Sequence, residues 1–214
     1  MTLRRGEPWG GPGPLAAGAP VVDSDAALIA CLGDIIAAGD PAEAGLVGGD
    51  LHTTLGAPSH SADELRAGRG VRYPVDVGSV EITSVDGSTR NLLFAAHLVA
   101  VQGPRMRPLF SRRTLVVMNT THRGGDDLGP RAHPGDGLLD VTDGSLGTWD
   151  RLRAKGRMAT GTHLPHPALC TSRARQTVAS FDPPATVAVD GVVLDSPVTR
   201  LEIECLPDAM TVVA

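Results

Sequence analysis

The sequence contains few aromatic residues and has no excess of positive charge. Aromatic side chains make up 3% of the 214 residues, and the formal net charge is −5. Proteins that bind single-stranded nucleic acids stack bases on aromatic rings, and proteins that bind duplexes present a basic surface. We therefore expect no nucleic-acid partner and a core built from Val, Leu, Ala and Ile.

Cysteine is also scarce, and no apolar run free of charge and proline is long enough to cross a bilayer. The three cysteines, Cys31, Cys170 and Cys205, are far apart and show no C-x-x-C spacing. Such a set disfavours a disulfide framework or a structural zinc site and is typical of a reducing compartment. Residues 1–20 lack the continuous apolar core of a signal peptide. We expect a cytoplasmic protein.

Motifs of covalent hydrolases are missing from the sequence. No serine stands in a G-x-S-x-G context, and no cysteine adjoins a plausible base. His163 and His166 are three residues apart, but two neighbouring prolines prevent a helix that would align them on one face. Histidines in such a context form hydrogen bonds more often than they bind a transition metal.

Composition divides the chain into three parts. Residues 1–20 are rich in Gly and Pro and should be irregular, and residues 21–66 contain helical patterns and a short strand. In residues 67–214, short apolar or alternating runs are separated by turn residues, which is typical of a β-sandwich or barrel. We expect one helix within this third part, over residues 146–161.

Apolar residues recur at helical spacing between residues 28 and 36, which predicts a helix. Its start can be capped by Asp23, Ser24 or Asp25, and Asp40-Pro41 should end it.

Two shorter helices should follow. The first should begin at Asp50 and close at Gly56, and the second should begin at Ser61 or Asp63.

The turn Gly48-Gly49-Asp50 leaves a short apolar strand and enters the first of these short helices. Glycine lets backbone N–H groups approach a phosphate closely, and a helix N-terminus favours negative charge. A tight turn in which Asp50 is the N-cap explains the same residues. This stretch alone leaves both alternatives open and favours the plain turn.

Carboxylates gather in "THRGGDDLGPRAHPGDGLLD", residues 121–140. Carboxylate and backbone carbonyl oxygens suit Mg²⁺ or Ca²⁺, which makes Asp136 a candidate metal ligand. A solvated loop with internal ion pairs explains the same charges. In an extended strand, Asp140 would lie about 13 Å from Asp136, too far to share an ion unless the chain turns.

Asp190-Gly191 lies between two apolar runs and most simply forms a hairpin turn. A carboxylate at the tip of a hairpin could also act as a general base. The local sequence does not decide between these two roles.

Several stretches, taken in order, resemble the diacylglycerol kinase- and sphingosine kinase-like lipid kinases, a family in the same superfamily as the NAD kinases. They are "GLVGGDLHTTLG", "YPVDVGSVEI", "LLFAAHLVA", "LVVMNTTHRGGDDLGPRAHPGDGLLDV", "TGTHLPHPALCTSRARQTVAS", "VAVDGVVL" and "LEIECLPDAMTVVA". In that family an α/β domain binds ATP and a β-sandwich supplies a lipid pocket. The resemblance implies an α+β fold: a truncated α/β segment, residues 21–66, packed on a C-terminal β-sandwich, residues 67–214.

The resemblance also implies nucleotide-binding residues. Asp25 matches the aspartate of the family's GGDGT motif, but "DSDAAL" retains none of its glycines. Gly48, Gly49 and Asp50 match the family's second glycine turn, without its threonine and asparagine. Phosphate binding requires close backbone approach, which the missing glycines would have allowed.

A base and a metal ligand are implied in the same way. Asp190 matches the family's proposed catalytic base, and Val192 stands where the family has a glutamate that assists the metal. Asp136 matches the second acid of a metal-binding motif, whose first acid is replaced by Gly135.

The function implied by the resemblance is ATP- and Mg²⁺-dependent phosphoryl transfer to a lipid hydroxyl. Such transfer depends on positioning and on electrostatic stabilisation, so the lost glycines and glutamate favour weak or absent activity. The alternatives are a non-catalytic lipid- or metabolite-binding protein and a pseudokinase subunit of an active enzyme. Expected partners are a lipid or other small molecule, a membrane surface contacted peripherally, and a second copy of the chain.

Overall fold

The computed structural model describes residues 9–103, 113–146 and 167–214. The helices in this part are α1 (Asp25–Ala38), α2 (Gly49–Leu55) and α3 (Ala62–Arg66). The strands are β1 (Gly11–Pro12), β2 (Val21–Val22), β3 (Glu43–Leu46), β4 (Val71–Ser84), β5 (Thr89–Phe94), β6 (His97–Gln102), β7 (Arg113–Met118), β8 (His122–Arg123), β9 (Asp126–Asp127), β10 (Leu139–Gly144), β11 (Leu169–Ala174), β12 (Gln176–Val189), β13 (Val192–Val193) and β14 (Val198–Val213). The helix expected over residues 146–161 falls almost entirely outside the described residues, as do His163 and His166.

Helix α1 forms where the apolar spacing predicts it. Ser24 is its N-cap, because the Ser24 side chain accepts a hydrogen bond from the N–H of Ala27 at 3.4 Å. Gly39 ends the helix in the left-handed conformation, with φ of 79°. One face of the helix is buried through Leu28, Leu32 and Ile36.

Helix α2 begins one residue earlier than expected. Its N-cap is Gly48, so the predicted capping role of Asp50 is wrong. The physical reason is that the carboxylate of Asp25 already accepts the first N–H groups of α2. Helix α3 starts with a capping box between Ser61 and Glu64. None of the described helices has the length and apolar character needed to span a membrane.

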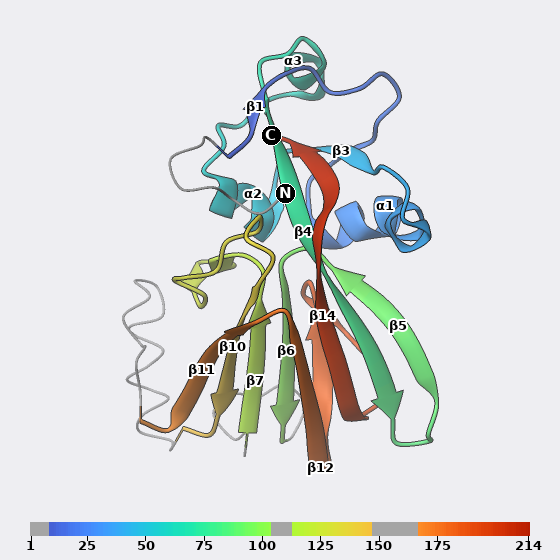
Figure 1. The fold of residues 1–214 in the computed structure, drawn as a ribbon, viewed down its shortest axis with the longest axis vertical. Helices are drawn as coiled ribbons and strands as arrows, with labels where there is room; N and C mark the ends of the chain where they lie inside the picture. Colours follow the sequence, from blue (N-terminus) through green and yellow to red (C-terminus); the bar gives the residue numbers. More distant parts are fainter. Residues whose placement is uncertain (1–8, 104–112, 147–166) are drawn as a thin grey trace.

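Most strands belong to one large curled sheet in the order β1-β4-β14-β12-β6-β7-β10-β11 (Figure 1). At one end, β3 pairs in parallel with β14, and β2 pairs in parallel with β3. The long strands β4 and β14 run from this helical end into the curled part of the sheet (Figure 1). The helical segment and the sandwich therefore share strands, and the boundary at residues 66–67 stays a prediction.

Both faces of the sheet are covered at the helical end. Val212 packs with residues of α1, α2 and β3, and the next residue, Val213, packs with Leu15 and Leu65. Successive residues of a strand point to opposite faces, so the helices α1 and α2 cover one face. Leu15, from the Gly/Pro-rich N-terminal part, joins α3 in covering the other face.

The curled part of the sheet encloses its own core. Buried Val, Leu, Ile and Ala side chains from both halves of the sheet fill the space between them, together with Phe94 and Phe181. The ring of Phe94 lies over Gly78 in β4, where an added Cβ would be 2.0 Å from the ring. This close approach explains why a glycine interrupts an otherwise β-favouring strand.

A candidate site at the helix–sandwich junction

Four residues from different elements are linked in series where the helices meet the curled sheet. Asp25 begins α1, Asp50 lies in α2, His97 begins β6, and Asp190 forms the turn after β12. We call these four residues the junction cluster. The sequence analysis named Asp25 and Asp50 as nucleotide-binding residues and Asp190 as the base, but it did not include His97.

The carboxylate of Asp25 binds the start of α2. It accepts hydrogen bonds from the N–H groups of Asp50 at 2.7 Å and Leu51 at 3.1 Å. Burial raises the pKa of Asp25, and these two hydrogen bonds oppose that rise. Asp25 therefore serves as an internal anion for the N–H groups that a bound phosphate would use.

The glycine pair before Asp50 is required by this packing. A Cβ on Gly49, which has a φ of 95°, would lie 2.8 Å from the Asp25 carboxylate. A Cβ on Gly48 would lie 2.5 Å from the carbonyl oxygen of Asp23. The packing of Asp23 and Asp25 therefore explains both glycines without a bound phosphate.

Asp50 connects α2 to the sandwich. Its Oδ1 accepts a hydrogen bond from the N–H of Gly124 at 2.7 Å, and its Oδ2 lies 3.6 Å from Nδ1 of His97. Nearby, the hydroxyl groups of Thr54 and Thr121 lie 3.2 Å apart. These contacts tie the loop around residue 124 to α2.

His97 is 3% exposed, and neither of its ring nitrogens has a hydrogen-bond partner among the described residues. Burial lowers its pKa to about 4, and the positive charge of Arg123 adds to this effect. At neutral pH the ring is therefore uncharged, and it faces Asp50 without a charge-assisted hydrogen bond.

Asp190 is held by backbone N–H groups at the start of β6. Its Oδ2 accepts from Ala95 at 2.7 Å, and its Oδ1 accepts from Ala96 and His97, each at 2.9 Å. Burial nevertheless raises its pKa to about 6, because desolvation outweighs these three hydrogen bonds. Both oxygens of the predicted base therefore already have partners within the chain.

Asp136 belongs to a separate cluster. Its Oδ2 forms an ion pair with Nη2 of Arg173, and Nε of Arg173 lies 2.9 Å from Oδ1 of Asp140. One guanidinium contacts both carboxylates, and the chain bends at Asp136 and Gly137, where Gly137 has a φ of 75°. The fully extended separation considered above therefore does not occur. Across residues 9–103, 113–146 and 167–214, no three His, Cys, Asp or Glu side chains are grouped to hold a metal ion. The residues at Asp136 thus do not fit a divalent cation.

Two buried polar residues were missed by sequence reasoning. Asp76 is 1% exposed and accepts from the N–H groups of Gly137 at 2.6 Å and Asp208 at 2.8 Å. The side-chain amide of Asn119, also buried, donates to the carbonyl oxygens of Asp76 and Ala95, each at 2.8 Å. An aspartate inside the apolar run "YPVDVGSV" was the available signal, since a charge is rarely buried without partners.

Comparison with known proteins assigns the family. Residues 79–214, more than half of the chain, match the model described as the YegS C-terminal NAD kinase β-sandwich-like domain. The chain belongs to this family. The sequence-based resemblance to NAD kinase- and diacylglycerol kinase-like proteins is thereby confirmed. No curated protein sequence matches this YegS-family chain.

Solved structures support the same fold. A putative diacylglycerol kinase from Bacillus anthracis str. Sterne aligns with a TM-score of 0.60 and 16% identity, covering 90% of this chain and 76% of its own. A diacylglycerol kinase from the same organism aligns with a TM-score of 0.55 and 17% identity, covering 90% and 74%. At such identities the similarity concerns the fold, and it confirms the predicted β-sandwich architecture.

Proposed function

We propose that this chain is a non-catalytic member of the YegS family, a pseudokinase that binds ligands or partners without transferring phosphate. The observation that carries this proposal is the structure of "DSDAAL", the segment that replaces the glycine-rich nucleotide motif. It forms the capped first turn of α1, where Ser24 occupies the N–H of Ala27 and Asp25 is turned toward α2.

The rest of the junction cluster supports the same conclusion. A nucleotide phosphate at the Gly48-Gly49 turn would meet the negative charge of Asp25 instead of free N–H groups, and like charges repel. Asp190 accepts three backbone hydrogen bonds, so taking a proton from a substrate would compete with contacts that hold its own hairpin.

A nucleotide titration tests this proposal. We expect the dissociation constant of ATP with Mg²⁺ to be weaker than millimolar, that is, a binding free energy less favourable than about −4 kcal/mol. Calorimetry measures the binding, and an assay of labelled phosphate transfer to diacylglycerol in mixed micelles measures turnover. An active diacylglycerol kinase in the same micelles is the positive control. Micromolar ATP binding, or turnover that Asp190→Asn abolishes, would refute the proposal.

A lipid is the ligand that one specific observation favours. Val192 and Val193, in the hairpin directly after Asp190, are 57% and 52% exposed. Exposed apolar side chains beside a buried polar group suit an amphiphile with a polar head and an apolar tail. The space between the two halves of the sheet is filled by buried side chains, so the hairpin is the better candidate for contact with an acyl chain.

Vesicle flotation tests the lipid proposal separately from catalysis. Vesicles of phosphatidylcholine containing diacylglycerol should carry the wild-type protein, and the double variant Val192→Asp/Val193→Asp should float several-fold less. Val178 is 55% exposed elsewhere on the sheet, so Val178→Asp is the matched control and should float like the wild type. Equal flotation of all three proteins, or no flotation of the wild type, would exclude a lipid contact at this hairpin.

A further inference from the structure

The turn that carries Asp136 is built around a guanidinium group. Nη2 and Nε of Arg173, in β11, contact the carboxylates of Asp136 and Asp140 respectively. A planar guanidinium can bridge two carboxylates in a fixed geometry, which an ammonium group cannot match. The positive charge of Arg173 thus stands between the two acids that a divalent cation would have to share.

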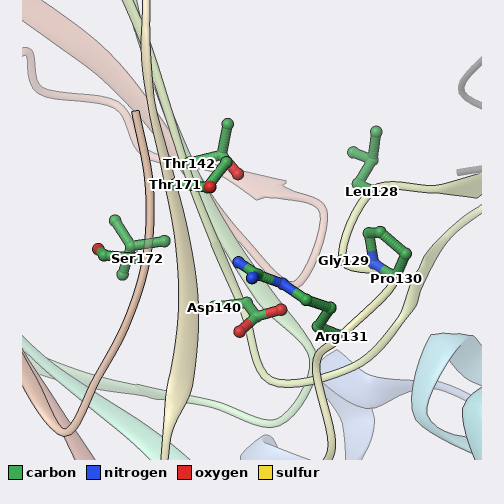
Figure 2. A pocket seen from close by; sticks show the side chains of 9 residues that line it. Leu128, Gly129, Pro130, Arg131, Asp140, Thr142, Thr171 and Ser172 are labelled. Atoms are coloured by element: carbon green, nitrogen blue, oxygen red, sulfur yellow. The ribbon is translucent and has the colours of Figure 1, made fainter. Parts of the chain in front are cut away.

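A second guanidinium approaches one of these acids, Asp140. Figure 2 shows Arg131 extending beside Asp140 into a pocket that Thr142 also lines. The positive charge of Arg131 favours the ionised form of Asp140, although burial raises the pKa of that carboxyl overall. The two guanidinium groups offset the charges of Asp136 and Asp140. A third carboxylate, Asp76, lies near Asp136, and the N–H groups of Gly137 and Asp208 already donate to its oxygens.

The position before Asp136 is closed by a tryptophan. A Cβ on Gly135 would lie 2.5 Å from Nε1 of Trp9, so an acidic side chain does not fit there. The Trp9 indole is fixed by donating a hydrogen bond to the carbonyl oxygen of Pro74 at 3.0 Å and by an edge contact with His133. The N-terminal segment therefore occupies the space that a second carboxylate ligand would need.

The backbone of the turn is also held without an ion. The N–H of Leu138 donates to Oδ1 of Asp136 at 3.0 Å, and the N–H of Gly137 donates to Oδ2 of Asp76 at 2.6 Å. Both oxygens of Asp136 thus have partners, one in its own turn and one in Arg173.

We propose that Arg173 replaces a divalent cation at this turn, so that a side chain of the protein supplies the positive charge and the folded chain needs no metal there. Trp9 and Gly135 complete the replacement by excluding the first acid of the motif. This inference is independent of whether the junction cluster transfers phosphate, and its test reads stability rather than activity.

The first test uses the wild-type protein. Its melting midpoint is measured with EDTA and with millimolar Mg²⁺ or Ca²⁺. A divalent ion bound at one hundred times its dissociation constant would raise the midpoint of a chain of this size by roughly 5–10 °C. We expect no rise with either ion, and a rise of that size that Asp136→Asn removes would overturn the proposal.

The second test removes the guanidinium. Arg173→Gln should lower the midpoint in EDTA, and millimolar Mg²⁺ or Ca²⁺ should recover part of that loss, because the two carboxylates are then free to bind an ion. Arg113→Gln is the matched control. Arg113, in β7, is about as exposed as Arg173 and forms an ion pair at 2.5 Å with a single carboxylate, Asp143 in β10. Metal should therefore not recover the stability lost in Arg113→Gln.

The outcomes of the second test separate the explanations. Recovery by metal in Arg173→Gln alone supports the replacement. No recovery in a folded Arg173→Gln protein, or equal recovery in both variants, would show that Arg173 is an ordinary ion pair and overturn the proposal. If Arg173→Gln does not fold, the wild-type titration still decides between a metal-binding turn and a metal-independent one.

Discussion

Replacing His97 with leucine should change how stability depends on pH without removing a side-chain hydrogen bond. Both ring nitrogens lack a partner among the described residues, and burial lowers the pKa of His97 from 6.5 to about 4. Asp190, which accepts the N–H of His97, has its pKa raised by burial from 3.8 to about 6. The two neighbouring groups therefore act in opposite directions over the same acidic range.

The magnitudes follow from the protons bound in each state. Below pH 6.5 the unfolded chain protonates His97 and the folded chain does not, so stability falls as pH falls. Over about 1.5 pH units, from 6.5 to 5, this costs about 2 kcal/mol. Below about pH 6 the folded chain protonates Asp190 before the unfolded chain does, so stability rises by about 1 kcal/mol at pH 5. The two effects oppose each other in the wild type.

Urea unfolding at about pH 7.5 and about pH 5 measures this compensation. The stability of His97→Leu relative to the wild type should be about 2 kcal/mol higher at pH 5 than at pH 7.5. All other groups titrate in both proteins and drop out of the comparison. The stability of Asp190→Asn relative to the wild type should instead be lower at pH 5 than at pH 7.5. Asparagine tolerates the positive φ of 44° at this position.

Two results would refute this reasoning. A stability difference between His97→Leu and the wild type that is the same at both pH values would mean that His97 does not resist protonation in the fold. If the stability of Asp190→Asn relative to the wild type were also higher at pH 5 than at pH 7.5, burial would not favour the protonated form of Asp190.

Three further substitutions test local contacts in other parts of the fold. Asp76→Asn should cost about 1–3 kcal/mol in urea unfolding, because an amide nitrogen would face one of the two N–H groups that the carboxylate now accepts; an unchanged midpoint would contradict this arrangement. Gly78→Ala should cost about 1–3 kcal/mol or more, because its Cβ would overlap the Phe94 ring, and adding Phe94→Leu should recover part of the loss. Ser61→Ala should cost about 1 kcal/mol in thermal unfolding by removing the capping box of α3, whereas no loss would mean that α3 is held by Leu65 alone.

The sequence was sufficient for features that depend on neighbouring residues. Helical spacing identified α1, and Ser61 begins α3 as one of the two residues considered. The hairpin turn at Asp190-Gly191 was also predicted from two adjacent residues and joins β12 to β13. In each case the deciding interaction lies within a few positions along the chain, where capping and turn preferences apply directly.

Features that depend on distant residues were not accessible in this way. The first N–H groups of α2 donate to Asp25, which lies 25 positions before Asp50 in the chain. The partner of Asp136 is Arg173, 37 positions away, and the residue that closes Gly135 is Trp9. Charge and residue type alone could not tell an ion pair from a metal site, because both use the same carboxylates.

The aspartates that carry the family resemblance all have partners within this chain. Asp25 binds the backbone of α2, Asp190 binds the backbone before β6, and Asp136 binds Arg173. A buried carboxylate without partners is costly, so these internal bonds make each aspartate useful to the fold even when no nucleotide or metal is bound. Substituting Asp25 or Asp190 would leave buried N–H groups unpaired, which penalises loss of the motif independently of activity. In this chain, therefore, the atoms that each aspartate contacts are better evidence about function than the presence of the aspartate itself.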